Sequence, residues 1–376
     1  MKKIRYILTL LLLFTNISFA QQNEINIKAT LNTNTNSLNV QQEIIYYNNS
    51  KETLNHIFLH NWANSFKDRK TPLSKRFIED FRKDLYFAKQ EDLGFSEVKN
   101  ISINYNNITY KELKNRKDII QLFLENAIKP NESVTINITY IIKIPNAKFT
   151  GYGFYENGYR LRYWYITPVI YNQGWQLMSN LNLDDLFEDY TTFNIELKIP
   201  KQLYLTSSLK QIKKSNKTKK FFHLSGKNEK DVLVDIQKIN TFKKFTTDTH
   251  EIQTNILEEE ISNSVTKSLL NRELQFLRAY LGVLPINKIL IDEVMRNKNP
   301  VYGLNQLPSL IRPFSDIINH DLTLFKVLSR KYLKQTLLLN ERKDYWLIDG
   351  LQNYLMIEYV NKFYPEMKLL GKAADT

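Results

Sequence analysis

The stretch Lys326-Val327-Leu328-Ser329-Arg330, followed after eighteen residues by Asp349, predicts two packed helices. From about residue 321 to 339, apolar residues recur at the three- and four-residue steps of an amphipathic helix. The polar run 340–343 ends this helix, and Asp344 is a candidate N-cap for a second helix that carries Asp349. Residues 326 and 330 share one helix face because they are four apart. An antiparallel partner would therefore place Asp349 against them.

This spacing is similar to that of the aminopeptidase N family of zinc metallopeptidases (gluzincins). The family signature is His-Glu-x-x-His, then eighteen residues, then a Glu within Trp-Leu-x-Glu-Gly. On this resemblance Lys326 takes the place of the first His, Val327 that of the general-base Glu, Arg330 that of the second His, and Asp349 that of the third ligand. Trp346, Leu347 and Gly350 match the family pattern.

The family's second signature, Gly-x-Met-Glu-Asn, holds the free amino group of the substrate. The run Tyr302-Gly303-Leu304-Asn305-Gln306 resembles it, with Gln306 at the Glu position. The resemblance makes Tyr302, Gly303, Asn305 and Gln306 candidate substrate-binding residues. It also implies that the negative charge expected beside an amino terminus is missing.

The residues at the zinc positions do not suit a zinc ion. Catalytic zinc takes imidazole nitrogens and carboxylate oxygens and keeps one position for water. A guanidinium has no lone pair to donate, so Arg330 cannot be a ligand, and Lys326 would first have to lose its proton. Val327 has no proton chemistry. We therefore expect no metal, no cofactor and no catalytic residue here, and an ion pair of Asp349 with Arg330 or Lys326; the open alternative is that both cations are simply solvated.

The rest of the chain predicts an α+β fold in two domains. Residues 21–246 carry alternating strand patterns such as Asn26–Leu31, Ser37–Tyr47 and Phe193–Ile199, with a possible helical insertion near 74–89. We expect an all-β sandwich or saddle domain there. Residues 247–376 show a helical stripe at 256–281, a short strand at 289–291 and the helix pair, typical of a thermolysin-like domain. Because the family continues with further helices, we expect this second domain to be truncated and the chain to be a fragment.

The first twenty residues predict export. A basic start (1–5), an apolar run (6–17) and small residues up to Ala20 are typical of a cleaved bacterial signal peptide. We expect a periplasmic or extracellular protein without a transmembrane segment in the mature chain. The absence of Cys excludes disulfides.

Three functions remain open from the sequence. The first is a non-catalytic relative, a pseudoenzyme that binds a peptide or envelope protein or serves as a scaffold. The second is an active zinc aminopeptidase with atypical ligands. The third is a basic module that binds the envelope surface, which the net charge of +13 permits. Export argues against nucleic acid as a partner. The densest basic run, 210–220, is most simply a solvated hairpin tip. The aromatic cluster of residues 152–165 is most simply core and interface of the β domain, and the open alternative is that it lines a peptide or sugar groove.

Overall fold

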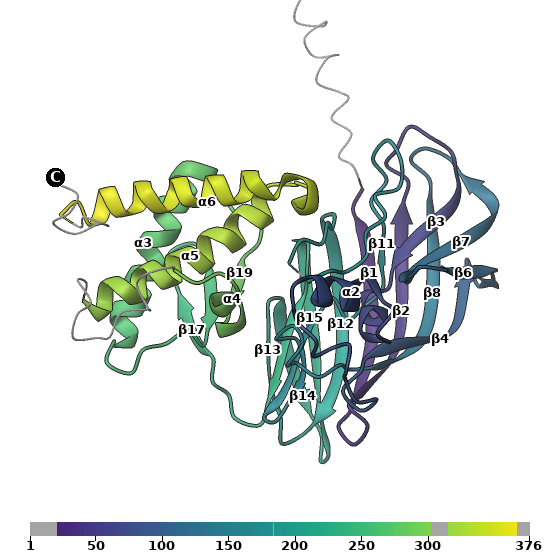
Figure 1. The fold of residues 1–376 in the computed structure, drawn as a ribbon, viewed down its shortest axis with the longest axis horizontal. Coiled ribbons are helices and arrows are strands. Elements are labelled where there is room, and N and C mark those ends of the chain that lie inside the picture. The colour runs from purple at the N-terminus through teal and green to yellow at the C-terminus, as the bar shows by residue number, and fades with distance from the viewer. Residues whose placement is uncertain (1–20, 183, 302–314, 367–376) are drawn as a thin grey trace, which may run out of the picture.

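The computed structural model describes residues 21–182, 184–301 and 315–366. A β part formed by the amino-terminal residues lies beside a smaller, mainly helical part formed by the carboxy-terminal residues (Figure 1). This is the α+β class that the sequence predicts. Residues 1–20, which the sequence predicts to be a signal peptide, and the candidate binding residues Tyr302, Gly303, Asn305 and Gln306 lie outside the described residues.

The largest sheet of the β part has eight strands. Its order is β14-β15-β12-β1-β2-β8-β4-β5. In chain order the strands are β1 Asn23–Asn32, β2 Ser37–Tyr47, β4 Phe95–Ile103, β5 Asn106–Asn107, β8 Ser133–Lys143, β12 Thr191–Pro200, β14 Lys210–Ser215 and β15 Lys219–Glu229. The β1–β12 pair is parallel, whereas the other neighbours run antiparallel. The basic run 210–220 forms the β14–β15 hairpin with its turn at 216–218, as predicted.

Two four-stranded sheets complete the β part. One has the order β13-β16-β10-β9 and the other β11-β3-β7-β6. Their strands are β3 Leu54–His60, β6 Tyr110–Leu113, β7 Arg116–Ile128, β9 Gly153–Tyr155, β10 Gly158–Arg162, β11 Thr167–Pro168, β13 Tyr204–Ser207 and β16 Leu233–Gln237. A short 3-10 helix, η1 (Trp62–Phe66), and helix α2 (Pro72–Glu79) follow β3. The helical insertion expected near 74–89 is thus shorter and begins earlier than predicted.

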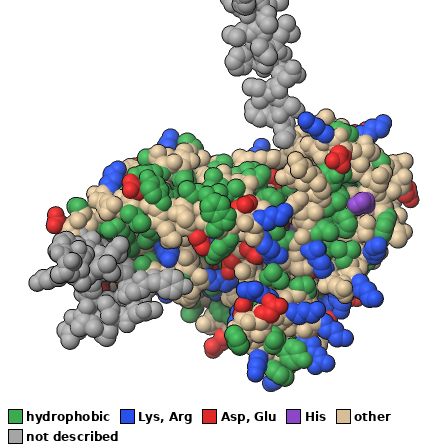
Figure 2. Space-filling model, turned by 45° about the horizontal axis from the view of Figure 1, so that its top comes forward, with side chains coloured by type: hydrophobic (Ala, Val, Ile, Leu, Met, Phe, Trp, Pro, Cys, Tyr) green, Lys and Arg blue, Asp and Glu red, His purple; other side chains and the backbone are tan. Residues whose placement is uncertain are grey.

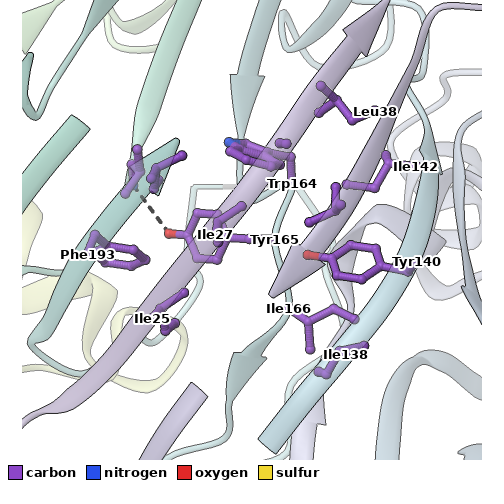
Figure 3. Packing of buried hydrophobic residues seen from close by; sticks show 14 of the residues in the cluster. Ile25, Ile27, Leu38, Ile138, Tyr140, Ile142, Trp164, Tyr165, Ile166 and Phe193 are labelled. Atoms are coloured by element: carbon purple, nitrogen blue, oxygen red, sulfur yellow. Dashed lines mark hydrogen bonds between the residues drawn. The ribbon is translucent and has the colours of Figure 1, made fainter. Parts of the chain in front are cut away.

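Strand alternation fills the core between these sheets. Ile25, Ile27, Tyr140 and Tyr165 all turn into one buried cluster (Figure 3). The two tyrosines keep their hydroxyl groups satisfied there, as buried tyrosines usually do. Tyr140 Oη donates to Gln42 Oε1, and Tyr165 Oη accepts from the backbone N–H of Val232 at 3.3 Å. The aromatic segment 152–165 is therefore largely core, as predicted.

The helical part has its own small sheet and core. Its strands, in the order β17-β18-β19, are β17 Lys243–Thr246, β18 Glu251–Thr254 and β19 Lys288–Ile291. Its helices are α3 Asn263–Leu281, α4 Glu293–Lys298, α5 Asp316–Thr336 and α6 Glu341–Phe363. Because β17 pairs with β18, this sheet begins before the proposed domain boundary at 246/247. The boundary stays a prediction, and β17 favours placing it ahead of Lys243.

The start of α6 differs from its prediction. The helix begins at Glu341, and Asn340 caps it by accepting hydrogen bonds from the backbone N–H groups of Arg342 and Lys343. Asp344 lies inside the helix at a kink, with non-helical backbone angles (φ −113°, ψ 23°). Asn340 takes the capping role because its side chain satisfies two of the free N–H groups of the first turn. None of the helices in the described part of the chain is long and apolar enough to cross a membrane.

Candidate functional site

Helices α5 and α6 bring the sequence-predicted positions together. They pack through buried side chains such as Leu328, Leu333, Ile348 and Leu355. Opposite this apolar seam, Arg330 on α5 forms an ion pair with Asp349 on α6. The side chain of Arg330 is 14% exposed and that of Asp349 is 38% exposed. The contact expected between positions 330 and 349 is therefore present.

The guanidinium of Arg330 is held from three sides. Besides its bond to Asp349, Nη1 donates to Gln352 Oε1 at 3.2 Å, and the group lies over the ring of Tyr345 at 5.0 Å. Burial works against the charged form, but the hydrogen bond to Asp349 and the nearby acidic groups raise the pKa of Arg330 above its ordinary value. Arg330 is therefore a permanent cation.

Lys326 lies one helical turn before Arg330 and contributes a second positive charge. Its Nζ donates to the carbonyl oxygen of Pro300 at 2.7 Å. Burial, followed by the charge of Arg330, lowers the pKa of Lys326, while Asp349 opposes that effect. Gln352 closes the turn by donating to the carbonyl oxygen of Lys326 at 2.6 Å and to Ser329 Oγ at 3.2 Å. Gln352 and Tyr345 were missed in the sequence, although each lies one helical turn from Asp349.

A cavity of about 500 Å³ opens beside Arg330, between the helical part and the β part. Val327 lines it from α5, and Tyr345 lines it from α6. The facing wall comes from the β part and from α4. The other lining residues are Tyr152, Arg162, Asn182, Asp184, Asp185, Met295, Lys298, Asn299, Lys331, Lys334, Glu341 and Arg342.

The charged groups around this cavity pair across the two parts of the molecule. The carboxylate of Asp231 forms ion pairs with Lys331 Nζ at 2.7 Å and with the guanidinium of Arg162 at 2.8 Å. Burial opposes ionisation of Asp231, but these two cations hold its pKa well below the ordinary range. A second link joins Arg342 on α6 to both carboxylate oxygens of Asp185, at 2.7 and 2.8 Å.

Two further ion pairs lie beside the cavity, one between the two parts and one within the helical part. Lys298 Nζ lies 2.9 Å from Asp184 Oδ2, and Lys334 pairs with Glu341. Every cation that lines the cavity thus has a carboxylate partner, counting Arg330 with Asp349. We call this set of ion pairs the cleft network: Arg162, Lys331 and Asp231; Lys298 and Asp184; Lys334 and Glu341; Arg342 and Asp185; Arg330 and Asp349.

The two closely spaced histidines lie far from metal-ligand geometry. His56 and His60 are both on strand β3. His60 is buried, stacks on Trp62 with ring centroids 4.5 Å apart, and accepts the backbone N–H of Met178 through Nε2 at 3.2 Å. Burial, with the nearby charges of Arg116 and Arg342, lowers the pKa of His60 to about 3. It is therefore a neutral core residue.

Comparison with known proteins identifies the fold. The chain resembles an M1 zinc metallopeptidase from Deinococcus radiodurans with a TM-score of 0.55 and 12% identity, over 95% of this chain and 73% of that one. A two-domain M1 zinc metallopeptidase mutant bound to L-arginine gives a TM-score of 0.55 and 13% identity, over 95% and 75% of the two chains. A mutant of the Deinococcus radiodurans enzyme bound to a Tyr-Ser-Ala substrate gives 0.54 and 12%, over 94% and 74%.

In sequence, no family model and no curated protein matches the chain. At this level of identity the likeness of the structures shows the fold, which is that of a two-domain M1 peptidase with α+β architecture. This confirms the fold class predicted from the sequence.

The described residues do not fit a zinc ion. Among them, no group of three or more His, Cys, Asp or Glu side chains lies close enough together to hold a metal. At the α5–α6 contact the only carboxylate of the three motif positions belongs to Asp349, and Arg330 already binds it. Two cations and one engaged carboxylate are the wrong donor set for a dication.

Proposed function

We propose that this chain is an M1-peptidase-like protein that does not hydrolyse peptides through zinc and instead binds a peptide or a protein partner in its cleft. The observation that carries the proposal is the ion pair of Arg330 with Asp349, at the positions matched to the second and third ligands of the zinc motif. Lys326 and Val327, at the positions of the first ligand and the general base, support the same conclusion. At these four positions a water molecule would find no set of ligands for a metal that lowers its pKa, and Val327 could not accept its proton.

The cavity beside Arg330 supports a binding role. Its volume of about 500 Å³ lies within the range of sites that take small ligands or a few residues of a peptide. Tyr152, Met295 and Tyr345 give it apolar surface among the charged groups. Since those charges are paired with one another, they shape the wall of the cavity and leave the apolar side chains as contacts for a ligand.

Metal content and hydrolysis test the catalytic half of this proposal. The purified protein is expected to carry no stoichiometric zinc and to release no anilide from leucine p-nitroanilide. A variant with Lys326→His, Val327→Glu, Arg330→His and Asp349→Glu restores the motif and is expected to take up about one zinc per chain. Stoichiometric zinc in the unmodified protein, with turnover that a chelator abolishes, would overturn the proposal in favour of an active metallopeptidase with atypical ligands.

Calorimetric titration with the tripeptide Tyr-Ser-Ala tests the binding half. We expect the unmodified protein to give a measurable heat of binding. The affinity should fall at least about tenfold in Tyr345→Ala, because that ring lines the cavity. The matched control is Tyr354→Ala, on the outer side of the same helix, which is half-exposed and outside the cavity lining. Equal loss in both variants, or no binding by the unmodified protein, counts against a peptide site in this cleft.

We also propose that the protein is exported and that signal peptidase removes residues 1–20. The basic start, the apolar run and Ala20 support this assignment. Amino-terminal sequencing of protein recovered from the periplasm or medium of an expressing bacterium should begin at Gln21. Recovery of uncleaved protein from the cytoplasm alone would refute it.

A further inference from the structure

The segment after η1 forms a small lobe on the surface of the β part, far in sequence from the cleft. We call residues 69–91, which include helix α2, the α2 lobe. Its inner face is fixed to the molecule by Leu73, Phe77 and Leu85, which are buried in one cluster with Phe149. Thr71 caps the helix by accepting the backbone N–H of Ser74 at 3.3 Å. The lobe is thus a packed part of the fold.

The outer face of the α2 lobe leaves large apolar side chains in solvent. Phe81 is 93% exposed and Phe87 is 72% exposed, and Ile78 and Tyr86 are also exposed. The rings of Tyr86 and Phe87 touch, with centroids 5.0 Å apart. Ile78 and Tyr86 line an open, mostly apolar hollow of about 580 Å³. A folded protein rarely gathers exposed apolar side chains in this way unless something covers them.

Basic side chains surround this apolar surface. Arg69, Lys70 and Lys75 line the same hollow as Ile78 and Tyr86, and Arg69 lies over the Tyr86 ring at 5.7 Å. The lobe contains seven Lys or Arg and four Asp or Glu, a net charge of +3. Its ion pairs use Arg76, Arg82 and Lys89. Within the described part of the chain, Arg69, Lys70, Lys75 and Lys83 take part in no ion pair, so their charges are available to an anionic partner.

The backbone at Phe81 adds an independent observation. Phe81 has φ of +59°, a left-handed conformation that a bulky residue seldom adopts. The conformation belongs to the end of helix α2: the backbone N–H of Phe81 donates to the carbonyl oxygen of Ile78 at 3.0 Å, and that of Arg82 donates to the carbonyl oxygen of Phe77 at 2.7 Å, the pattern of a helix C-cap. This cap holds the apolar ring of Phe81 in solvent.

We infer that the α2 lobe is a docking surface for an anionic lipid bilayer. Aromatic rings favour the boundary between headgroups and acyl chains, and Lys and Arg side chains extend along apolar surface to reach lipid phosphates. A bilayer suits separate rings in a shallow, open hollow, whereas a protein partner needs a shaped and contiguous contact. Figure 2 shows Lys and Arg side chains spread over the β part, with hydrophobic side chains and some Asp and Glu between them. This inference does not depend on the proposed function of the cleft.

Vesicle flotation of the mature protein tests it. Phosphatidylcholine vesicles with about one quarter phosphatidylglycerol, in about 0.1 M salt, are expected to bind the protein, and pure phosphatidylcholine vesicles are not. Phe81→Ser with Phe87→Ser should reduce binding by at least about tenfold, and each of Lys70→Gln and Lys75→Gln by about fivefold. All four side chains are on the surface, so the melting temperature should not change.

Matched controls separate a docking site from the general basic charge. Tyr105→Ser removes a ring that is equally exposed and also lies on a left-handed backbone position. Lys213→Gln and Lys217→Gln remove charges from the exposed β14–β15 hairpin. These variants should bind like the unmodified protein. Equal loss in lobe and control variants, or no binding to the anionic vesicles at all, overturns the inference, and capture of an acidic protein by the lobe without vesicle binding does so as well.

Discussion

The cleft and the α2 lobe use charge in opposite ways. In the cleft network every lining cation has a carboxylate partner, and most of these side chains are largely buried. In the α2 lobe the ion pairs are exposed. Four of the lobe's cations form no ion pair with any residue that the structure describes. The first arrangement holds two parts of the molecule together, whereas the second leaves charge free for another surface. Position in the fold, more than the total charge of +13, therefore decides what each cation does.

The strongest way to break this comparison is to remove one carboxylate from each region. Asp231→Ala would leave Lys331 without its carboxylate and Arg162 with only its longer contact to Asp184 at 3.4 Å, and these two side chains are only 10% and 8% exposed. We expect a loss of about 3 kcal/mol or more in the free energy of unfolding, measured with urea. Glu79→Ala in the lobe, whose partner Arg76 is half-exposed, should change it by less than about 0.5 kcal/mol. Similar losses in the two variants would show that the cleft network is not structural.

The pH dependence of the free energy of unfolding tests a second buried carboxyl group of this region, Glu229, two residues before Asp231. Burial, opposed by Lys331 and Lys288, raises the pKa of Glu229 from about 4.5 to about 8. A carboxyl group with a raised pKa binds its proton more tightly in the folded state, so its contribution is fully present below about pH 4.5 and is lost as the pH rises to about 8. Between those pH values the free energy of unfolding should therefore fall by roughly 2 to 4 kcal/mol less in Glu229→Gln than in the unmodified protein. The exposed residue Glu258, changed to Gln, should leave the pH profile unaltered.

The Arg330–Asp349 pair should contribute less to stability than the buried groups above, because Asp349 is partly exposed to solvent. A double-mutant cycle with Arg330→Gln and Asp349→Ala should give a coupling energy of about 1 kcal/mol in thermal or urea unfolding. If Asp349→Ala alone changes stability by less than about 0.5 kcal/mol, the pair does not contribute and both side chains behave as solvated groups.

The contact of Arg330 with Asp349 could be predicted because it depends on local spacing. Two periodic helices and a short connection fix which positions meet, and the structure has that contact. The predicted start of α6 was wrong because two polar residues, Asn340 and Asp344, both suit an N-cap, and only the backbone geometry decides between them.

The partners across the cleft could not be predicted in the same way. Lys331 and Asp231 are a hundred residues apart, and nothing in either local pattern indicates the other. The exposed rings of the α2 lobe were also missed, because the sequence predicted only a helical insertion near 74–89. That prediction does not say which of its apolar side chains remain exposed to solvent. Phe81 shows this most clearly, since its left-handed backbone depends on how α2 ends.

The smallest expected effect concerns the pair of Arg76 with Asp80 on α2, at 3.0 Å and an i,i+4 spacing. Both side chains are about half-exposed, so water and salt screen their attraction and holding two long side chains costs entropy. A double-mutant cycle with Arg76→Ala and Asp80→Ala should therefore give only about 0.3 to 0.5 kcal/mol, falling toward zero in about 1 M salt. The coupling of Asp231 with Lys331 should persist in the same salt, because little solvent reaches that pair. A salt-resistant coupling in the lobe would mean that this pair stabilises the fold in the same way as the ion pairs of the cleft.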